Sequence, residues 1–407
     1  MSQAKVKQME DAVIVAGVRT AIGKLMGSLE SQTPDCLAAA VIGELLRRTN
    51  VEGQDVDEVI FGQAKQTADC SNVARVAALR AGIPETVPGY TVHRQCGSGV
   101  QALNSAAMQI QTNNARIIIA GGVESMSTAP YYVNGIRGGI KAGNLVLKDP
   151  NTESQPGSQP IEKYGDLRMG MTAENIAQQY GITRQEQDLF ALQSQERAAQ
   201  AVKEGVFREE IVPYEVKRKK QTILFDQDEH LRQTSMEALG KLQPAFKAGG
   251  SVTAGNSSGR NDGAAALMVM AKQTAREMGF REAYRVVSFA SAGVEPQLMG
   301  LGPIPATRQA LEKAGLELEQ MDVIELNEAF AAQALAFFRE FKLDYRDPRV
   351  NPNGGAIAMG HPIGGTGAIL LTKLIHEMHR KEARFGLVTL CIAGGMGIAT
   401  ILERECL

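Results

Sequence analysis

The stretch HRQCGSG, residues 93–99, stands directly before apolar residues at helical spacing: Val100, Leu103, Ala106, Ala107 and Ile110. This arrangement predicts a helix whose N-terminus lies just after Cys96. The stretch recurs in reduced form 268 residues later, where His361 and Gly365-Thr366-Gly367 match His93 and Gly97-Ser98-Gly99. The repeat predicts two copies of one structural unit, each with a glycine-rich turn before a helix.

Further matches extend the repeat on both sides of this stretch. Ala115-Arg116 recurs as Ala383-Arg384 at the same offset of 268 residues. Residues 119–122 and 392–395 share the sequence Ile-Ala-Gly-Gly, five residues later than that offset predicts, and 58–60 resembles 322–324 at offset 264. An ordered series of matches indicates an ancient duplication rather than chance.

Short apolar or β-branched runs alternate with helical patterns along the chain, which predicts an α/β fold. We expect strands at 13–16, 59–61, 117–120, 267–270, 286–289, 323–326, 387–390 and 398–402. We expect helices at 37–48, 73–81, 100–112, 184–204, 307–314, 329–341 and 368–380.

The two copies leave a middle segment unassigned. Residues 127–250 are polar and rich in Gly, Pro and Gln, and they contain one strong helical pattern, 184–204. We therefore expect a first half formed by 1–126 and 251–277, an inserted loop domain at 127–250, and a second half at 278–407. Such insertions often carry substrate contacts, although the segment is also compatible with a decorative subdomain.

Composition narrows the class of protein. The chain has 407 residues, a net charge of −2 and 44% hydrophobic residues, which predicts a large core and gives no electrostatic case for nucleic acid or a membrane surface. The basic run 217–220 is typical of a solvated surface segment. The first ten residues include Glu10 and no apolar core, so we expect no secretory signal and a cytoplasmic protein.

Three reactive side chains lie in glycine-rich surroundings. Five widely spaced cysteines, with no CxxC pair, favour neither a disulfide framework nor a zinc site, so we expect no metal. Cys96 at a helix N-terminus is placed where exposed N–H groups and the helix dipole favour a thiolate. His361 offers a base and Cys391 a second thiol. Taken singly, His361 is compatible with a structural histidine and Cys391 with a buried packing residue.

Together with other segments, these residues resemble the thiolase family of acyl-CoA acyltransferases over nearly the whole chain. The segments that carry the resemblance are 94–99, Asn327-Glu328-Ala329-Phe330, 353–367 and 391–397, with 169–175 and 252–256 in the middle. The resemblance implies the thiolase fold: two similar α/β halves stacked as five layers, α-β-α-β-α, with an inserted lid domain. It also implies a homodimer or homotetramer.

The resemblance also assigns roles to residues. It implies that Cys96 carries the acyl group as a thioester, that His361 takes the thiol proton, and that Cys391 moves the α-proton of the acetyl group. It implies one oxyanion site formed by His361 and a water held by Asn327, and another formed by the backbone N–H groups of Cys96 and Ala393. CoA is then a substrate, and no metal or other cofactor is implied.

Contacts with CoA thioesters follow by position in the same way. The resemblance places Met169 beside the acyl end and Ser258 against a pantetheine amide, and it has Phe246 and Phe330 wall the tunnel, although both rings are equally compatible with ordinary core packing. Arg232 and Ala254 fall in the segments that contact CoA.

Two positions depart from the family pattern. Arg168 stands where short-chain acetoacetyl-CoA thiolases have a histidine, so we expect longer ketoacyl chains to be accepted. Ala393 replaces a common glycine, which keeps the N–H but restricts the backbone. Two alternatives remain: a ketoacyl-synthase-like condensing enzyme, and a non-catalytic acyl-CoA-binding relative. Cys391 disfavours the first alternative and the intact set of four reactive residues disfavours the second.

Overall fold

A computed structural model describes residues 9–218 and 221–407, with the backbone alone at Arg218. Lys219 and Lys220 of the basic run, and residues 1–8 of the N-terminal segment, lie outside the described residues. The N-terminal half consists of β1 (Ala12–Thr20), β2 (Gly23–Lys24), α1 (Pro34–Thr49), β3 (Glu58–Gly62), α2 (Val73–Arg80), β4 (Gly89–Val92), α3 (Ser98–Gln111), β5 (Ile117–Ser125), β9 (Asn261–Ala271) and α9 (Lys272–Glu277).

The C-terminal half repeats this order. It consists of β10 (Glu282–Gly293), α10 (Pro303–Ala314), β11 (Val323–Leu326), α11 (Ala331–Glu340), α12 (Ala356–Met359), α13 (Ile363–Arg380), β12 (Phe385–Ile392) and β13 (Met396–Cys406). The strands run β4-β3-β5-β9-β1 in the first half and β11-β12-β13-β10 in the second. A parallel bridge between Ile324 and Val350 takes the place that the β3–β4 pairing has in the first half. The expected duplication is therefore confirmed.

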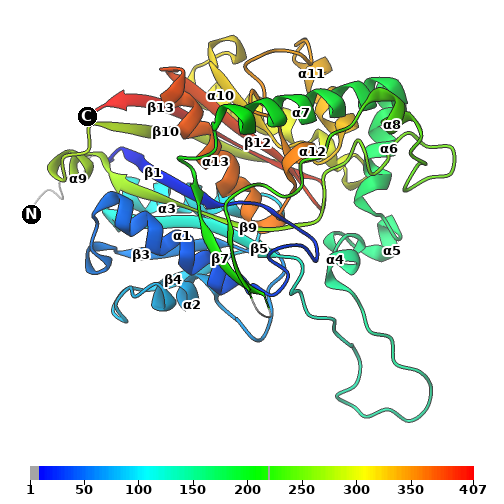
Figure 1. Ribbon diagram of the computed structural model, residues 1–407, viewed down its shortest axis with the longest axis horizontal. Helices are drawn as coiled ribbons and strands as arrows, with labels where there is room; N and C mark the ends of the chain where they lie inside the picture. The colour runs from blue at the N-terminus through cyan, green and yellow to red at the C-terminus, as the bar shows by residue number, and fades with distance from the viewer. Residues whose placement is uncertain (1–8, 219–220) are drawn as a thin grey trace, which may run out of the picture.

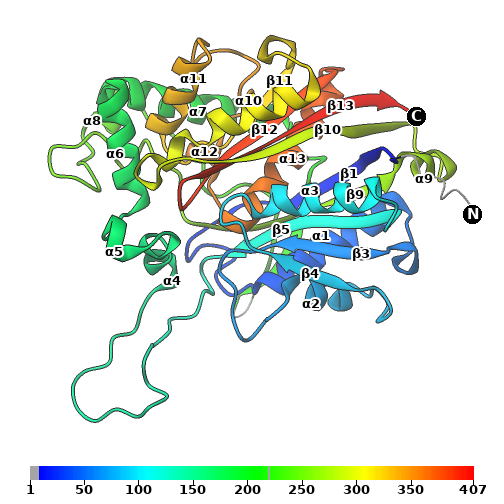
Figure 2. The same ribbon diagram turned by 180° about the vertical axis from the view of Figure 1, so that it is seen from behind.

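The two half-sheets meet where β1 pairs with β10 through Val13↔Arg285 and Ile14↔Tyr284. Figures 1 and 2 show the resulting layers: α1 and α2 outside the first half-sheet, α3 and α13 between the half-sheets, and α10 and α11 outside the second. The central pair α3 and α13 contact each other, and α13 also packs on β5, β9 and β12. This is the expected α-β-α-β-α stack.

Glycines allow the central helices to approach backbone to backbone at their N-termini. A Cβ atom on Gly99 would lie 2.5 Å from the backbone N of Ala368, and one on Gly367 would lie 2.5 Å from the backbone N of Val100. We expected a helix from 368, but α13 begins at Ile363, because these glycines serve the helix crossing rather than a turn ahead of the helix. The two helix starts, with Cys96 and His361 just before them, are thus brought together.

The chain between β5 and β9 covers one end of this stack. It contains α4 (Pro150–Glu153), α5 (Ile161–Tyr164), α6 (Met169–Tyr180), α7 (Arg184–Glu204), β6 (Ile211–Val212), the hairpin of β7 (Tyr214–Arg218) and β8 (Gln221–Phe225), and α8 (Met236–Gly240). Thr183 and Glu186 form a capping box at the start of α7, which explains the strong helical signal there. Figures 1 and 2 show the loop that leads from β5 to α4 reaching away from the body of the molecule.

Candidate active site

Cys96 lies on a tight turn between β4 and α3. Gln95 has φ +46°, in the left-handed region that disfavours residues other than glycine, and Gly97 is the N-cap of α3. Ser98 fixes the turn: its Oγ accepts from the Arg94 N–H at 2.9 Å and donates to the Gln95 carbonyl at 2.6 Å. The expected placement of Cys96 just before a helix is confirmed, and the strained backbone directs its side chain into a cavity.

His361 is held by contacts on two sides. Its backbone N–H donates to Asn261 Oδ1 at 2.9 Å, and its Nδ1 lies 2.7 Å from Thr366 Oγ1. The Thr366 hydroxyl donates its one proton to the Pro362 carbonyl at 3.0 Å, so it accepts from Nδ1–H. The Nε2 atom is then the unprotonated nitrogen. Burial lowers the pKa of His361 to about 4, which keeps the ring neutral and able to accept a proton.

Cys391 lies near the end of β12, where it pairs with Gly397 of β13, and Ala393 follows in the turn between the two strands. Gly394 and Gly395, with φ values of +91° and +82°, form this turn, whereas Ala393 avoids the left-handed region and its methyl group causes no strain there. The Ala393 N–H donates to the Cys96 sulfur. Its N–H therefore lies beside the Cys96 sulfur, and the oxyanion role that the family resemblance implies stays a prediction.

The electrostatics of the two thiols differ from our expectation. Burial raises the pKa of Cys96 to about 11, outweighing the lowering by the Ala393 N–H and Lys65. Burial also raises the pKa of Cys391, and the nearby Cys96 adds to that shift. The expectation that the helix N-terminus gives Cys96 a thiolate is wrong, because the desolvation of the thiol disfavours the charged form more than the neighbouring N–H groups favour it.

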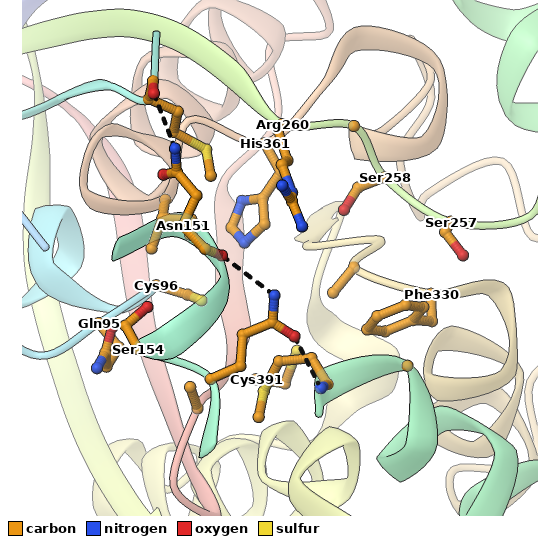
Figure 3. A pocket seen from close by; sticks show the side chains of 18 of the residues that line it. Gln95, Cys96, Asn151, Ser154, Ser257, Ser258, Arg260, Phe330, His361 and Cys391 are labelled. Atoms are coloured by element: carbon orange, nitrogen blue, oxygen red, sulfur yellow. Dashed lines mark hydrogen bonds between the residues drawn. The ribbon is translucent and has the colours of Figure 1, made fainter. Parts of the chain in front are cut away.

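A single cavity unites most of the expected residues. Among its lining residues are Cys96, His361, Cys391, Ala393, Met169, Phe246, Ser258 and Phe330. Figure 3 shows Cys96, His361 and Cys391 around one space, with Ser258 and Phe330 on its other side. Phe246 and Phe330 meet edge to face with ring centres 6.1 Å apart, so both rings form a wall of the cavity rather than ordinary core.

Asn327 is not among the residues that line this cavity. It follows β11 and is fully buried, and neither its Oδ1 nor its Nδ2 has a hydrogen-bond partner within the described part of the chain. An unsatisfied buried amide of this kind suits a bound water.

Three other expected residues do not line the cavity. Arg232 and Ala254 contact each other, with Arg232 Nη2 donating to the Ala254 carbonyl at 2.8 Å, and Arg232 lines a neighbouring groove along α7. Arg168 is directed outward, where it pairs with Asp166 at 3.0 Å. Met169, at the start of α6, does line the cavity, together with Gly170.

The sequence analysis missed several polar residues of the cavity: Lys65, Gln95, Asn151, Ser154, Gln155 and Arg260. Lys65 follows β3 and Cys96 follows β4, and both strands are parallel neighbours in the sheet. Because ligands bind at the carboxyl ends of parallel strands, the position of Lys65 after β3 could have identified it as a residue of the site. Glu124 binds this loop to α13 by accepting from the N–H groups of Ala64, Lys65 and Gly364 at 3.1, 3.0 and 2.9 Å. The remaining residues include Asn151, Ser154 and Gln155 of the insertion, where no sequence pattern predicted which side chains face the cavity.

Within residues 9–217 and 221–407, no group of three or more His, Cys, Asp or Glu side chains is arranged to hold a metal ion. None of the described helices is long and apolar enough to span a membrane.

Comparison with known proteins agrees with this geometry. Residues 12–273 match the thiolase N-terminal domain and residues 280–404 the thiolase C-terminal domain. An acetyl-CoA acetyltransferase of Pseudomonas aeruginosa is 50% identical over 399 residues, covering 98% of this chain and 100% of the relative. A 3-oxoadipyl-CoA/3-oxo-5,6-dehydrosuberyl-CoA thiolase of Escherichia coli is 48% identical over 406 residues, covering 97% and 100%.

Solved structures show the same similarity in three dimensions. The acetyl-CoA acetyltransferase of Bacillus anthracis superposes with a TM-score of 0.94 at 45% identity, covering 98% of this chain and 100% of that chain. Human mitochondrial 3-ketoacyl-CoA thiolase in complex with CoA superposes with a TM-score of 0.92 at 40% identity, covering 98% and 99%.

The layered α/β duplication brings two thiols and an imidazole into one cavity, an arrangement that suits acyl transfer. With both thiolase domains matched over nearly its whole length, the chain belongs to the thiolase family and has thiolase activity.

Proposed function

We propose that Cys96, His361, Cys391 and Asn327 carry out the reversible reaction 3-ketoacyl-CoA + CoA = acyl-CoA + acetyl-CoA, with acetoacetyl-CoA among the substrates. The observation that carries this assignment is the shared cavity, in which a neutral His361 with a free Nε2 accompanies two protonated thiols. Every proton that the reaction moves has a donor or acceptor there.

In the first step, the Cys96 sulfur attacks the 3-keto carbon while its proton passes to His361 Nε2. The bond between C2 and C3 then breaks, and the electron pair passes into the enolate of acetyl-CoA. The thiol of Cys391 protonates that enolate at C2. The acyl group remains on Cys96 as a thioester.

In the second step, free CoA gives its thiol proton to the Cys391 thiolate and attacks the acyl carbonyl. Cys96 leaves and regains its proton from His361. The N–H groups of Cys96 and Ala393 serve one oxyanion, and His361 with a water on Asn327 serves the other. In other enzymes, removing one such donor costs about 3–4 kcal/mol of transition-state stabilisation.

CoA enters as a substrate between the segment around Ser258 and the aromatic pair Phe246 and Phe330, and the chain needs no metal or other cofactor. The insertion at 127–250 provides the binding region, and Arg232 with Ala254 extends it along α7. The support is positional: Ser258 and both rings line the cavity, and Arg232 lines the adjoining groove.

Acyl chains longer than four carbons fit the same cavity. Arg168 does not support this substrate range, because its side chain is directed outward. The support is now the set of three methionines that line the cavity, Met126, Met169 and Met299, because methionine side chains adapt to ligands of different length. Catalytic efficiency should hold or rise from acetoacetyl-CoA to 3-ketohexanoyl-CoA, and a collapse at six carbons would contradict this substrate range.

We also infer a cytoplasmic homodimer or homotetramer. All five cysteines are free thiols, which suits a reducing compartment. The loop between β5 and α4 exposes apolar side chains that suit contact with another subunit, among them Tyr131, Ile136, Ile140, Leu145, Val146 and Leu147.

The test uses acetyl-CoA as the acyl donor and mass spectrometry as the readout. The wild-type protein should gain one acetyl group on Cys96, and Cys96→Ala should gain none. Cys391→Ser should still be acetylated but should lose condensation and thiolysis, because the α-proton then has no partner of suitable pKa. Thiolysis at a near-normal rate in Cys391→Ser would make Cys391 a packing residue. Acyl transfer only from a carrier protein would favour a condensing enzyme, and no acetylation would favour a binding protein.

A further inference from the structure

Lys65 places a buried positive charge in the active cavity. It follows β3 and its side chain lines the same space as Cys96, although only 6% of the residue is exposed. Among the described residues, the hydrogen-bond partner of its ammonium group is Ser154 Oγ. Across the described part of the chain, no carboxylate lies within 4.0 Å of its ammonium group. A buried ammonium with two unused donors and no counterion is costly unless it binds a ligand.

The acidic groups nearest to Lys65 are engaged elsewhere. Glu124 accepts three backbone N–H groups, from Ala64, Lys65 itself and Gly364, and it attracts the ammonium only from beyond ion-pair distance. Asp149 also acts from a distance, and it caps α4 by accepting from the Asn151 N–H at 2.9 Å. Neither carboxylate therefore neutralises Lys65 directly.

The cavity as a whole is suited to an anion. Among its described lining residues there are two cations, Lys65 and Arg260, and no Asp or Glu. Uncharged hydrogen-bonding side chains, including Gln95 and Ser154, surround the Lys65 end. Opposite charges attract each other more strongly in a buried site than in water. This lining therefore favours a substrate that brings a negative group deep into the cavity.

The position of Lys65 identifies which part of the substrate this is. Ser154, its hydrogen-bond partner, lies with Gln95 on one side of Cys96, whereas Ser257, Ser258 and Phe330 lie across the cavity on the other side (Figure 3). Pantetheine approaches from the Ser258 side in the proposed function. The group that reaches Lys65 therefore belongs to the acyl chain beyond the thioester, and the phosphates of CoA remain on the opposite side.

We propose that Lys65 binds the terminal carboxylate of the acyl chain, so that the enzyme accepts CoA thioesters of 3-oxodicarboxylic acids as well as neutral 3-ketoacyl-CoA. The inference rests on the proposed function, since it concerns the acyl end of the same site. It makes Lys65 a specificity-determining residue for the free end of the substrate.

The test compares two substrates of equal carbon number, 3-oxoadipyl-CoA and 3-oxohexanoyl-CoA, which end in a carboxylate and a methyl group. The measured quantity is the ratio of their kcat/KM values in thiolysis. Lys65→Met should lower this ratio at least about tenfold, because a charge-assisted contact is lost for one substrate only. Lys65→Gln, which can keep a bond to Ser154, should lower it as well. The exposed Lys203→Met on α7 is the control and should leave the ratio unchanged.

The outcomes separate this inference from the proposed function. Equal losses for both substrates in both Lys65 variants would overturn the inference, since Lys65 would then act on Cys96 or on folding. An unchanged ratio would overturn it too. Wild-type protein that cleaves neither substrate would refute the proposed function instead.

Discussion

Replacing Thr366 with valine removes the group that fixes the tautomer of His361. The Thr366 hydroxyl accepts from His361 Nδ1–H across 2.7 Å in a buried site, and valine keeps the shape without the oxygen. A buried N–H left without a partner costs about 1–3 kcal/mol, and the ring can escape that cost by moving its proton to Nε2. Nε2 then carries a hydrogen and cannot accept the thiol proton. We expect the rate of Cys96 acylation by acetyl-CoA to fall roughly 10–100-fold.

The same helix provides a matched control. Thr372 is buried on α13 and its hydroxyl donates to the Ala368 carbonyl at 2.9 Å, just as Thr366 donates to Pro362, but it makes no contact with His361. Thr372→Val should therefore lower stability about as much as Thr366→Val and leave acylation intact. Thr366→Ser should restore the rate. Acylation by Thr366→Val within threefold of Thr372→Val would refute the assignment of Nε2 as the base.

Three further predictions follow from the same geometry. Because the pKa of His361 is about 4, the acylation rate should stay level as pH falls from 7 to 5 and decline only near 4, where the protonated ring can no longer accept a proton. Stopped-flow measurement of CoA release follows this rate. A decline centred near pH 6.5, the ordinary pKa of histidine, would contradict the prediction. Gly99→Ala should destabilise the protein by about 1–3 kcal/mol in urea unfolding, because its Cβ would meet the Ala368 N at 2.5 Å, whereas Gly43→Ala, with open space around it in α1, should be neutral or stabilising. Cys391→Ser should lose exchange of the acetyl-CoA methyl protons with deuterated solvent, measured by NMR, and retained exchange would assign that proton transfer to another group.

Much of the fold is predictable from the repeat, because a duplicated unit constrains both halves at once. All eight expected strands lie within observed ones. The start of α13 was missed because glycine disfavours helices locally, and only the partner helix shows why Gly365 and Gly367 are helical. β4 was missed because it is a short strand at the end of the sheet, where burial imposes no clear alternation.

The sequence pointed to the three residues of the proposed mechanism for a different reason. Cys96 and His361 lie beside glycines just before a helix, and Cys391 lies in β12 just before the glycines of the following turn. Lys65 lies in no glycine-rich stretch. Its place after β3 was the signal available, and only the fold shows that this lysine is buried. The pKa of Cys96 was predicted in the wrong direction for a related reason: the sequence reveals the helix N-terminus, but not the depth at which the closed cavity holds the thiol.

Burial determines the protonation states of the reactive side chains in the free enzyme. Cys96 and Cys391 are thiols and His361 is a neutral ring, so the free enzyme holds no preformed thiolate–imidazolium pair. In the proposed mechanism, charge appears only when a thioester arrives and its carbonyl oxygen takes up negative charge beside the Ala393 N–H. The donors that stabilise that oxygen therefore also determine when Cys96 loses its proton. In the proposed mechanism Ala393 therefore affects the nucleophile as much as the transition state, because proton transfer to His361 is favourable only once the oxyanion at the Ala393 N–H has begun to form.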